Sequence, residues 1–537
     1  KAGEWYAEGW RKMGQLGLLG LQFPEEYGGS GASVLTTAAA FQAFTAGGAD
    51  AGIALSWVAH SVLAGTPIWH FGTDAQKRKY LTKIATGEWT AGYGLTEPGA
   101  GSDAASLQTT AVKKGDCYVL NGSKMFITNA PVGDVFVVFA TEDRSLGSRG
   151  ISAFIVERGF PGFSSGRELD KMGNRTSPTG ELIFQDCEVP AENLLGESHK
   201  GFAIAKAALE WERFLMMAHS VGTMQAVLRD CLRYAKQRSQ FGKPIFEQPA
   251  IQAKLANMQL NAAAGELFVR RVAWLKDQSN ALGPTPLESS ACKIFCSNAV
   301  MQSALQGVQL MGGYGYMREN AVERAMRDAK LAEIGGGTTE IQRQVVGRQM
   351  LHQPDQRWDA AYTPEQVAAR CQQPSEAPDL VAAALSVAEQ ARRKPAFDST
   401  AGDDPTRSAL FTAATATGLA EAALDEALEC ARAIHEGDLV QLVEFKLADI
   451  RTRVDGARML VHKAAARLDA GADASEAARL ARIFAAEAAV FCAEQAASLT
   501  GERSARTERL IQAVHRPELS GSSLLEERLA LARSLSA

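Results

Sequence analysis

A carboxylate with aromatic neighbours is the residue of this chain best suited to acid–base chemistry. Glu212 lies between Trp211 and Phe214 in the segment 209–214. A carboxylate is a weak base in water, but burial beside apolar groups raises the pKa of a Glu toward the working pH. Glu212 is therefore a candidate general base. Its local sequence alone favours a solvated helix charge or an ion-pair partner of Arg213, because most Glu residues are solvated.

Two glycine-rich segments retain backbone N–H groups and leave room around them. Residues 335–337 are successive glycines followed by Thr338 and Thr339. Residues 93–103 read Tyr-Gly-Leu-Thr-Glu-Pro-Gly-Ala-Gly-Ser-Asp and add several hydroxyl groups. The structural alternatives are a flexible loop for the first segment and a Gly–Pro turn for the second.

The order of these segments along the chain resembles that of the acyl-CoA dehydrogenases. These flavoenzymes desaturate an acyl thioester between its α and β carbons. Further segments complete the resemblance: Asn-Gly-Ser-Lys-Met-Phe-Ile-Thr-Asn at 121–129, Arg-Ser-Gln-Phe-Gly-Lys-Pro at 238–244 and Gln-Leu-Met-Gly-Gly-Tyr-Gly at 309–315. Together they cover roughly residues 1–350, and several motifs in family order are far more specific than any one of them.

The resemblance places the catalytic base at Glu212. Most of the family carries a Glu two residues before the Thr of the segment that here spans 335–339, and that position is Gly336. A minority, including isovaleryl- and long-chain-type enzymes, carries the base just before the Arg of the segment that here spans 209–214, and that position is Glu212. Gly336 is then expected to bind the thioester oxygen through its backbone N–H. Glu340 is the weaker candidate for a substitute base.

The resemblance also implies FAD as the cofactor and assigns residues around it. Thr128 is expected near flavin N5, and Phe126 takes the place of a Trp often found beside the flavin face. Pro249 stands where relatives often have a Gln near FAD, which puts that contact in doubt. The residues expected to bind FAD are Tyr93, Leu95, Thr96, Gly101, Ser102, Phe126, Ile127, Thr128, Arg238, Gln240, Phe241, Gln309, Leu310, Gly312, Gly313, Thr338 and Glu340. Those expected to bind substrate are Ser102, Glu210, Trp211, Arg213 and Gly337.

The pattern along the chain predicts an α+β, mostly α, multi-domain protein. Residues 1–90 have helical periodicity, and 91–197 contain short β-branched runs at 134–140 and 150–156. Residues 198–352 are helical again, 353–405 form a Pro-punctuated linker region, and 406–537 form an extra helical domain. The resemblance implies a middle β-barrel-like domain and a C-terminal four-helix bundle.

The extra domain faintly repeats the bundle. Residues 441–450 echo 250–258, and 488–491 echo 298–301, so we predict a degenerate copy without its own cofactor. Such a tail is similar to that of the very-long-chain branch, which implies a homodimer, and by resemblance Arg238 and Gln309 approach the FAD of the neighbouring subunit. Peripheral membrane contact through amphipathic tail helices and ordinary bundle packing stay open as alternatives.

Composition narrows the remaining function classes. A formal net charge of -5 argues against nucleic acid as the main ligand, because phosphate binding needs a clustered basic surface. Cys292 and Cys296 share an apolar helix face, so core thiols are expected in place of metal ligands or a disulfide. No apolar run is expected to approach the roughly 18 residues of a membrane span. No signal peptide is recognised, so we expect a cytoplasmic protein in a bacterium, or a mitochondrial matrix or inner-membrane-associated protein in a eukaryote. Lys1 corresponds to a position inside an early helix of the family, so the loss of a targeting segment stays open.

The leading function is dehydrogenation of acyl-CoA with an electron-transfer flavoprotein as acceptor. The tail favours long acyl chains. The alternatives are a non-catalytic assembly factor on the same scaffold, which loss of both base positions would favour, and an acyl-CoA oxidase that uses oxygen.

Overall fold

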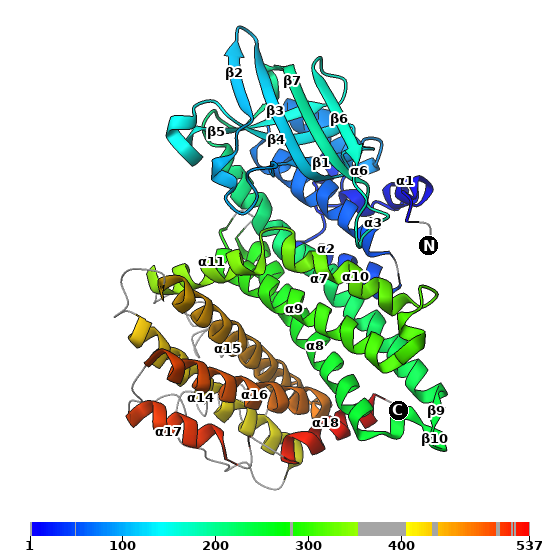
Figure 1. The fold of residues 1–537 in the computed structure, drawn as a ribbon, viewed down its shortest axis with the longest axis vertical. Coiled ribbons are helices and arrows are strands. Elements are labelled where there is room, and N and C mark those ends of the chain that lie inside the picture. The colour runs from blue at the N-terminus through cyan, green and yellow to red at the C-terminus, as the bar shows by residue number, and fades with distance from the viewer. Residues whose placement is uncertain are drawn as a thin grey trace. The chain divides into compact units, whose positions relative to one another are not determined.

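The computed structural model describes residues 3–48, 50–279, 283–352, 404–431, 439–500, 505–516, 519 and 522–535. The predicted linker region 353–405 lies almost wholly outside these residues. The chain, drawn in Figure 1, divides into two compact units. The first comprises Lys1–Val227, Val269–Val308 and Tyr314–Thr339, and the second comprises Leu228–Phe268, Gln309–Gly313 and Glu340–Ala537.

The first unit begins with short helices whose starts follow from their capping residues. Thr73 caps its helix and forms a reciprocal capping box with Gln76. The helices are α1 (Ala7–Gln15), α2 (Val34–Ala46), α3 (Ala51–Trp57), α4 (Thr66–Phe71), α5 (Asp74–Gln76) and α6 (Thr82–Thr86), with π-helical turns η3 (Val58–Gly65) and η4 (Lys77–Leu81) between them.

One helical stretch corrects an expectation from the sequence. Ala51–Phe71 runs for 21 residues and contains an 18-residue window of mean hydropathy 1.3, so it is long and apolar enough to cross a membrane by length and composition. The polar residues Ser56, His60 and Thr66 interrupt its apolar run, so the sequence analysis did not predict a stretch of this length. Because 89% of it is buried inside the protein, it serves as a core helix, with His60 accepting the Ala91 N–H at 2.9 Å.

A sheet follows these helices in the same unit. The predicted strands at 134–140 and 150–156 are present as β4 and β5. The strands are β1 (Ala91–Gly94), β2 (Thr110–Lys114), β3 (Cys117–Thr128), β4 (Val135–Thr141), β5 (Ile151–Glu157), β6 (Phe163–Glu168), β7 (Thr179–Pro190) and β8 (Leu194–Leu195). They pair in the order β6-β7-β3-β2-β4-β5-β8, with β1 parallel to β4.

Both faces of this sheet are covered by buried apolar side chains. Phe139, Ile151 and Leu195 on one face pack with residues of the N-terminal helices. Phe136, Phe154 and Leu182 on the other face form a second core within the sheet region. The near-continuous apolar runs of β4 and β5 follow from burial on both faces.

Long helices form the rest of the catalytic region. They are α7 (Gly201–Gln237), α8 (Pro249–Gln278), α9 (Pro286–Met311), α10 (Ala321–Ile334) and α11 (Thr339–His352), with a small hairpin of β9 (Ser239–Gln240) and β10 (Lys243–Pro244) between α7 and α8. The predicted fold class, helical then sheet then helical, is confirmed. Cys292 and Cys296 are buried on α9 and carry no disulfide.

The second unit contains the extra helical domain. Its helices are α14 (Pro405–Ala431), α15 (Leu439–Asp469), α16 (Ser475–Thr500), α17 (Ala505–Val514) and α18 (Ser522–Ser534). The first three lie side by side (Figure 1), and buried alanines line their contacts. Within this unit α11 packs closely on α15, since a Cβ added at Gly347 would lie 2.5 Å from the Cα of Glu444.

Candidate active site

Glu212 is a buried carboxylate on α7. Only 6% of the residue is exposed, and its Oε2 has no hydrogen-bond partner among the described residues. Burial raises the pKa of Glu212 to about 7, while the nearby Lys293 and Arg213 cations oppose that rise. A carboxylate with a pKa near neutrality is matched to proton abstraction at neutral pH.

Gly336 lies directly against this carboxylate. A Cβ added at Gly336 would lie 2.9 Å from Glu212 Oε2, so a side chain there would collide with the acid. Gly336 and Gly337 both have left-handed backbones, with φ of 67° and 88°, which glycine adopts without the penalty of a Cβ. Arg213 Nε approaches the Gly336 carbonyl at 3.4 Å. The two positions that resemble the family's base sites therefore share one small volume.

Aromatic residues next to Glu212 along α7 pack together in the interior. Trp211 is buried, with its ring 5.9 Å from that of Phe214 and 6.4 Å from that of Trp69. Glu210, a predicted substrate residue, instead accepts from Lys276 Nζ at 3.2 Å and from the Thr285 N–H at 2.9 Å. These bonds tie the start of α7 to α8 and α9 within the first unit.

The structure brings the two predicted flavin segments together. The Met125 N–H donates to the Thr96 carbonyl at 2.9 Å, so the loop after β1 lies beside the end of β3. Tyr93, Leu95 and Ile127 are buried.

Other members of these segments face outward. Gly101 and Ser102 are exposed, and Thr128 is half-buried. Phe126 is 66% exposed and has a left-handed backbone with φ of 62°. An exposed aromatic ring on an uncommon backbone conformation indicates a functional position.

A buried ion pair that sequence reasoning missed fastens these segments. Lys124 Nζ donates to Glu97 Oε1 at 2.7 Å and to the Leu95 carbonyl at 3.3 Å. Glu97 also accepts the backbone N–H groups of Gln108 and Thr109. The signal in the sequence was a lone Lys in an otherwise strand-like segment. Glu97 and Lys124 both lie within the two predicted flavin segments, where other residues were expected to bind FAD.

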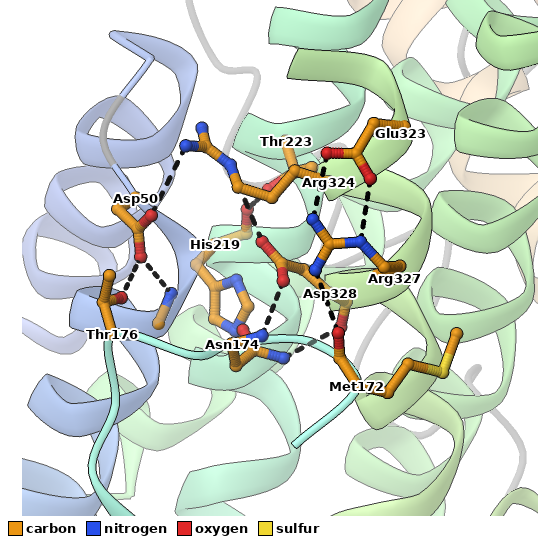
Figure 2. A network of polar contacts seen from close by, with 11 residues as sticks. Asp50, Met172, Asn174, Thr176, His219, Thr223, Glu323, Arg324, Arg327 and Asp328 are labelled. Atoms are coloured by element: carbon orange, nitrogen blue, oxygen red, sulfur yellow. Dashed lines mark hydrogen bonds and ion pairs between the residues drawn. The ribbon is translucent and has the colours of Figure 1, made fainter. Parts of the chain in front are cut away.

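A second network, also missed, anchors α10 (Figure 2). Asp328 on α10 accepts the Asn174 N–H at 2.5 Å, and Asn174 Nδ2 donates to the Asp328 carbonyl at 3.0 Å. Arg324 reaches Asp50, the N-cap of α3, at 3.6 Å. The network joins the N-terminal helices, the loop before β7 and α10. Because α10 leads into the 335–337 loop, these contacts fix where Gly336 stands.

The remaining predicted residues divide between the two units. Thr338 follows Gly337 in the first unit. Arg238, Gln240, Gln309, Leu310, Gly312, Gly313 and Glu340 belong to the second unit with Phe241. Phe241 is 95% exposed at the tip of the β9–β10 hairpin. The expected roles of these residues at a subunit interface stay predictions.

Comparison with known proteins decides the family. Family models match in chain order: the acyl-CoA dehydrogenase N-terminal domain at 1–88, the middle domain at 92–187 and the C-terminal domain at 199–351 and again at 385–520. The chain belongs to the acyl-CoA dehydrogenase family.

Individual relatives support this assignment. A short-chain-specific acyl-CoA dehydrogenase of Megasphaera elsdenii is 44% identical over 63% of this chain and 88% of its own. A mitochondrial isovaleryl-CoA dehydrogenase of Oryza sativa is 42% identical over 64% of this chain and 82% of its own. The solved structure of an acyl-CoA dehydrogenase complexed with FAD from Bacillus anthracis is 30% identical, covers 98% of this chain and 88% of its own, and has a TM-score of 0.81.

The raised pKa of Glu212 predicts a pH-dependent stability difference between this acyl-CoA dehydrogenase and its Glu212→Gln variant. The protonated acid is favoured in the fold, so its contribution is complete below the unfolded value of 4.5 and is lost as pH rises through about 7. We expect the wild type to lose about 3 kcal/mol relative to the variant between about pH 4.5 and about pH 7. Denaturant unfolding of both proteins across this range measures the difference, and parallel curves would contradict the assigned shift.

Proposed function

We propose that this protein is an FAD-dependent acyl-CoA dehydrogenase in which Glu212 removes the α-proton of the substrate. The observation that carries the proposal is the buried, unpartnered Oε2 of Glu212 beside Gly336. A buried carboxylate without a partner costs free energy, so its retention indicates a ligand-facing role. Family membership supports the same reaction class.

The residues present fit FAD. Phe126 exposes an apolar ring at the end of β3, and Thr128 adds a hydroxyl on the same strand. Cβ atoms added at Gly99 and Gly101 would meet no atom within 4 Å, so that loop has open space for a large ligand. FAD would be held by these residues, and when bound it supplies the hydride-accepting chemistry of the β carbon.

The protein's own groups would perform the acid–base part. Near its pKa of about 7, Glu212 is ionised in enough molecules to accept the α-proton. The backbone N–H of Gly336 would donate to the thioester oxygen, which gains negative charge as that proton leaves. Only 6% of Glu212 is exposed, so burial excludes water from the acid and its basicity is not reduced by solvation.

Replacing Glu212 with Gln tests the assignment. The amide preserves shape and removes the proton acceptor, so we expect flavin reduction by substrate to slow by about a hundredfold to ten-thousandfold while FAD stays bound. Anaerobic stopped-flow absorbance of the flavin measures this rate. Glu157→Gln is the control. Glu157 ends β5 and accepts from the Tyr80 hydroxyl, and the flavin of this variant should be reduced by substrate at a near-normal rate.

Relocating the acid provides the converse variant. Glu212→Gly removes the group that a side chain at 336 would strike, so Gly336→Glu in that background should recover at least about tenfold of the lost rate. Recovery stays partial because φ of 67° at Gly336 is unfavourable for a residue with a Cβ. Near-normal reduction in Glu212→Gln would remove the basis of the proposal.

For the substrate we propose a long straight-chain acyl-CoA. The support is the extra domain, which the alignments with the short-chain and isovaleryl relatives leave uncovered because they span 63% and 64% of this chain. We expect kcat/KM in a dye-linked assay to rise from butyryl- through octanoyl- to palmitoyl-CoA, since each buried CH₂ contributes about 0.8 kcal/mol. Preference for butyryl- or isovaleryl-CoA would overturn the long-chain part and leave the reaction class intact.

As electron acceptor we propose an electron-transfer flavoprotein, in keeping with the dehydrogenase relatives. In air, hydrogen peroxide should form far more slowly than an electron-transfer flavoprotein or dye is reduced under the same substrate saturation. A coupled peroxidase assay measures the first rate, and dye absorbance the second. Comparable rates would reassign the protein as an oxidase.

A further inference from the structure

Lys293 is a buried cation on α9 that the proposed reaction has not used so far. None of the residue is exposed, and its neighbours Cys292 and Ile294 are buried apolar groups. Its Nζ donates to the Gly337 carbonyl at 2.7 Å. A Lys is almost never fully buried unless it is paired, because taking an ammonium group out of water costs several kcal/mol. Such a group is retained for what it holds in place.

What it holds is the loop opposite Glu212. A trans peptide is planar, so fixing one carbonyl also fixes the direction of the next N–H. Lys293 fixes the carbonyl of Gly337, and Arg213 approaches the carbonyl of Gly336. Two cations from α9 and α7 therefore orient successive peptide planes in a segment whose glycines would otherwise be the most mobile residues of the site.

The same cation also acts electrostatically on the carboxylate. The ionisable groups around Glu212 are Lys293 on α9, Arg213 on α7 and Tyr93 on β1. The pKa of Tyr93 is raised far above its usual value by burial and by Glu212, so Tyr93 stays neutral and contributes no compensating charge. Lys293 and Arg213 are thus the positive charges that oppose the effect of burial on Glu212.

We propose that Lys293 is a positioning residue for dehydrogenation, which holds the 335–337 loop against Glu212 and places a compensating charge beside that carboxylate. The inference rests on the proposed role of Glu212 as the base. It concerns residues of the first unit alone, and it assigns a function to a Lys whose sequence neighbours, Cys292 and Ile294, suggest only a core position.

Lys293→Gln and Lys293→Met separate the two effects. Gln keeps a donor for the Gly337 carbonyl and removes the charge, so the acid limb of the kcat–pH profile should move up by about one pH unit. Met removes both the donor and the charge, so its acid limb should move by the same amount. Its rate on the alkaline plateau should also fall by about tenfold or more, because misplaced reacting groups react more slowly. KM should rise in the Met variant and stay near the wild-type value in the Gln variant.

Two further variants make the result decisive. Lys293→Arg keeps charge and donors and should restore the wild-type limb, which also covers the case in which the Met protein does not fold. Lys171→Gln is the matched control, since Lys171 also donates to a backbone carbonyl, that of Ser177, and its loss should leave the limb in place.

The outcomes distinguish this inference from the proposed function. An unshifted acid limb in Lys293→Gln, or an equal shift in Lys171→Gln, would overturn the role of Lys293 even if Glu212→Gln is inactive. Activity in Glu212→Gln would overturn the base assignment instead, whatever the Lys293 variants do. A shifted limb restored by Arg, with an inactive Glu212→Gln, supports both.

Discussion

The contact between Glu212 and Gly336 is the constraint on which the catalytic region depends. The carboxylate occupies the space that a side chain at 336 would need, 2.9 Å from the place of its Cβ. With its carboxylate in this place, Glu212 fits beside a glycine at 336. Because interiors are close-packed, a side chain at 336 would force the carboxylate end of Glu212 to move away from its present position. The sequence places the acid on α7 and a glycine opposite it.

Keeping that fit requires rigid supports on both sides. Glu210, Lys276 and Thr285 fasten the start of α7, while Asp328 and Asn174 fasten α10 before the glycine loop. Burial raises the pKa of Asp328 to about 6, and the hydrogen bond from the Asn174 N–H opposes that rise. Asp328 is therefore mostly ionised at neutral pH. Each support is a buried polar pair whose members lie far apart in sequence, and breaking one partner would leave the other unsatisfied.

The sequence predicted features that depend on local chemistry or on position within a motif. The strands at β4 and β5 and the order of helical and sheet regions follow from periodicity. The aromatic neighbours of Glu212 did not by themselves predict its burial, and its position within the motif made it the candidate base. The partners of Glu97, Lys124 and Asp328 could not be predicted, because a buried charge has no local signature beyond an interrupted apolar run. The apolar length of Ala51–Phe71 was not predicted, because polar residues within a buried helix cannot be told from solvent-facing ones by sequence.

The extra domain can be compared with the helical region at 199–351. The C-terminal domain model matches 385–520 as well as 199–351, yet the described part of the second match uses its buried charges differently. Arg451 pairs with Asp455 one turn along α15, and Arg458 on α15 bonds Glu421 on α14. These carboxylates accept from an Arg, as Glu210 accepts from Lys276, whereas the Oε2 of Glu212 is buried without a hydrogen-bond partner among the described residues. A carboxylate oxygen that already accepts from a cation is less available to take up a proton. This difference is consistent with the base proposed at Glu212.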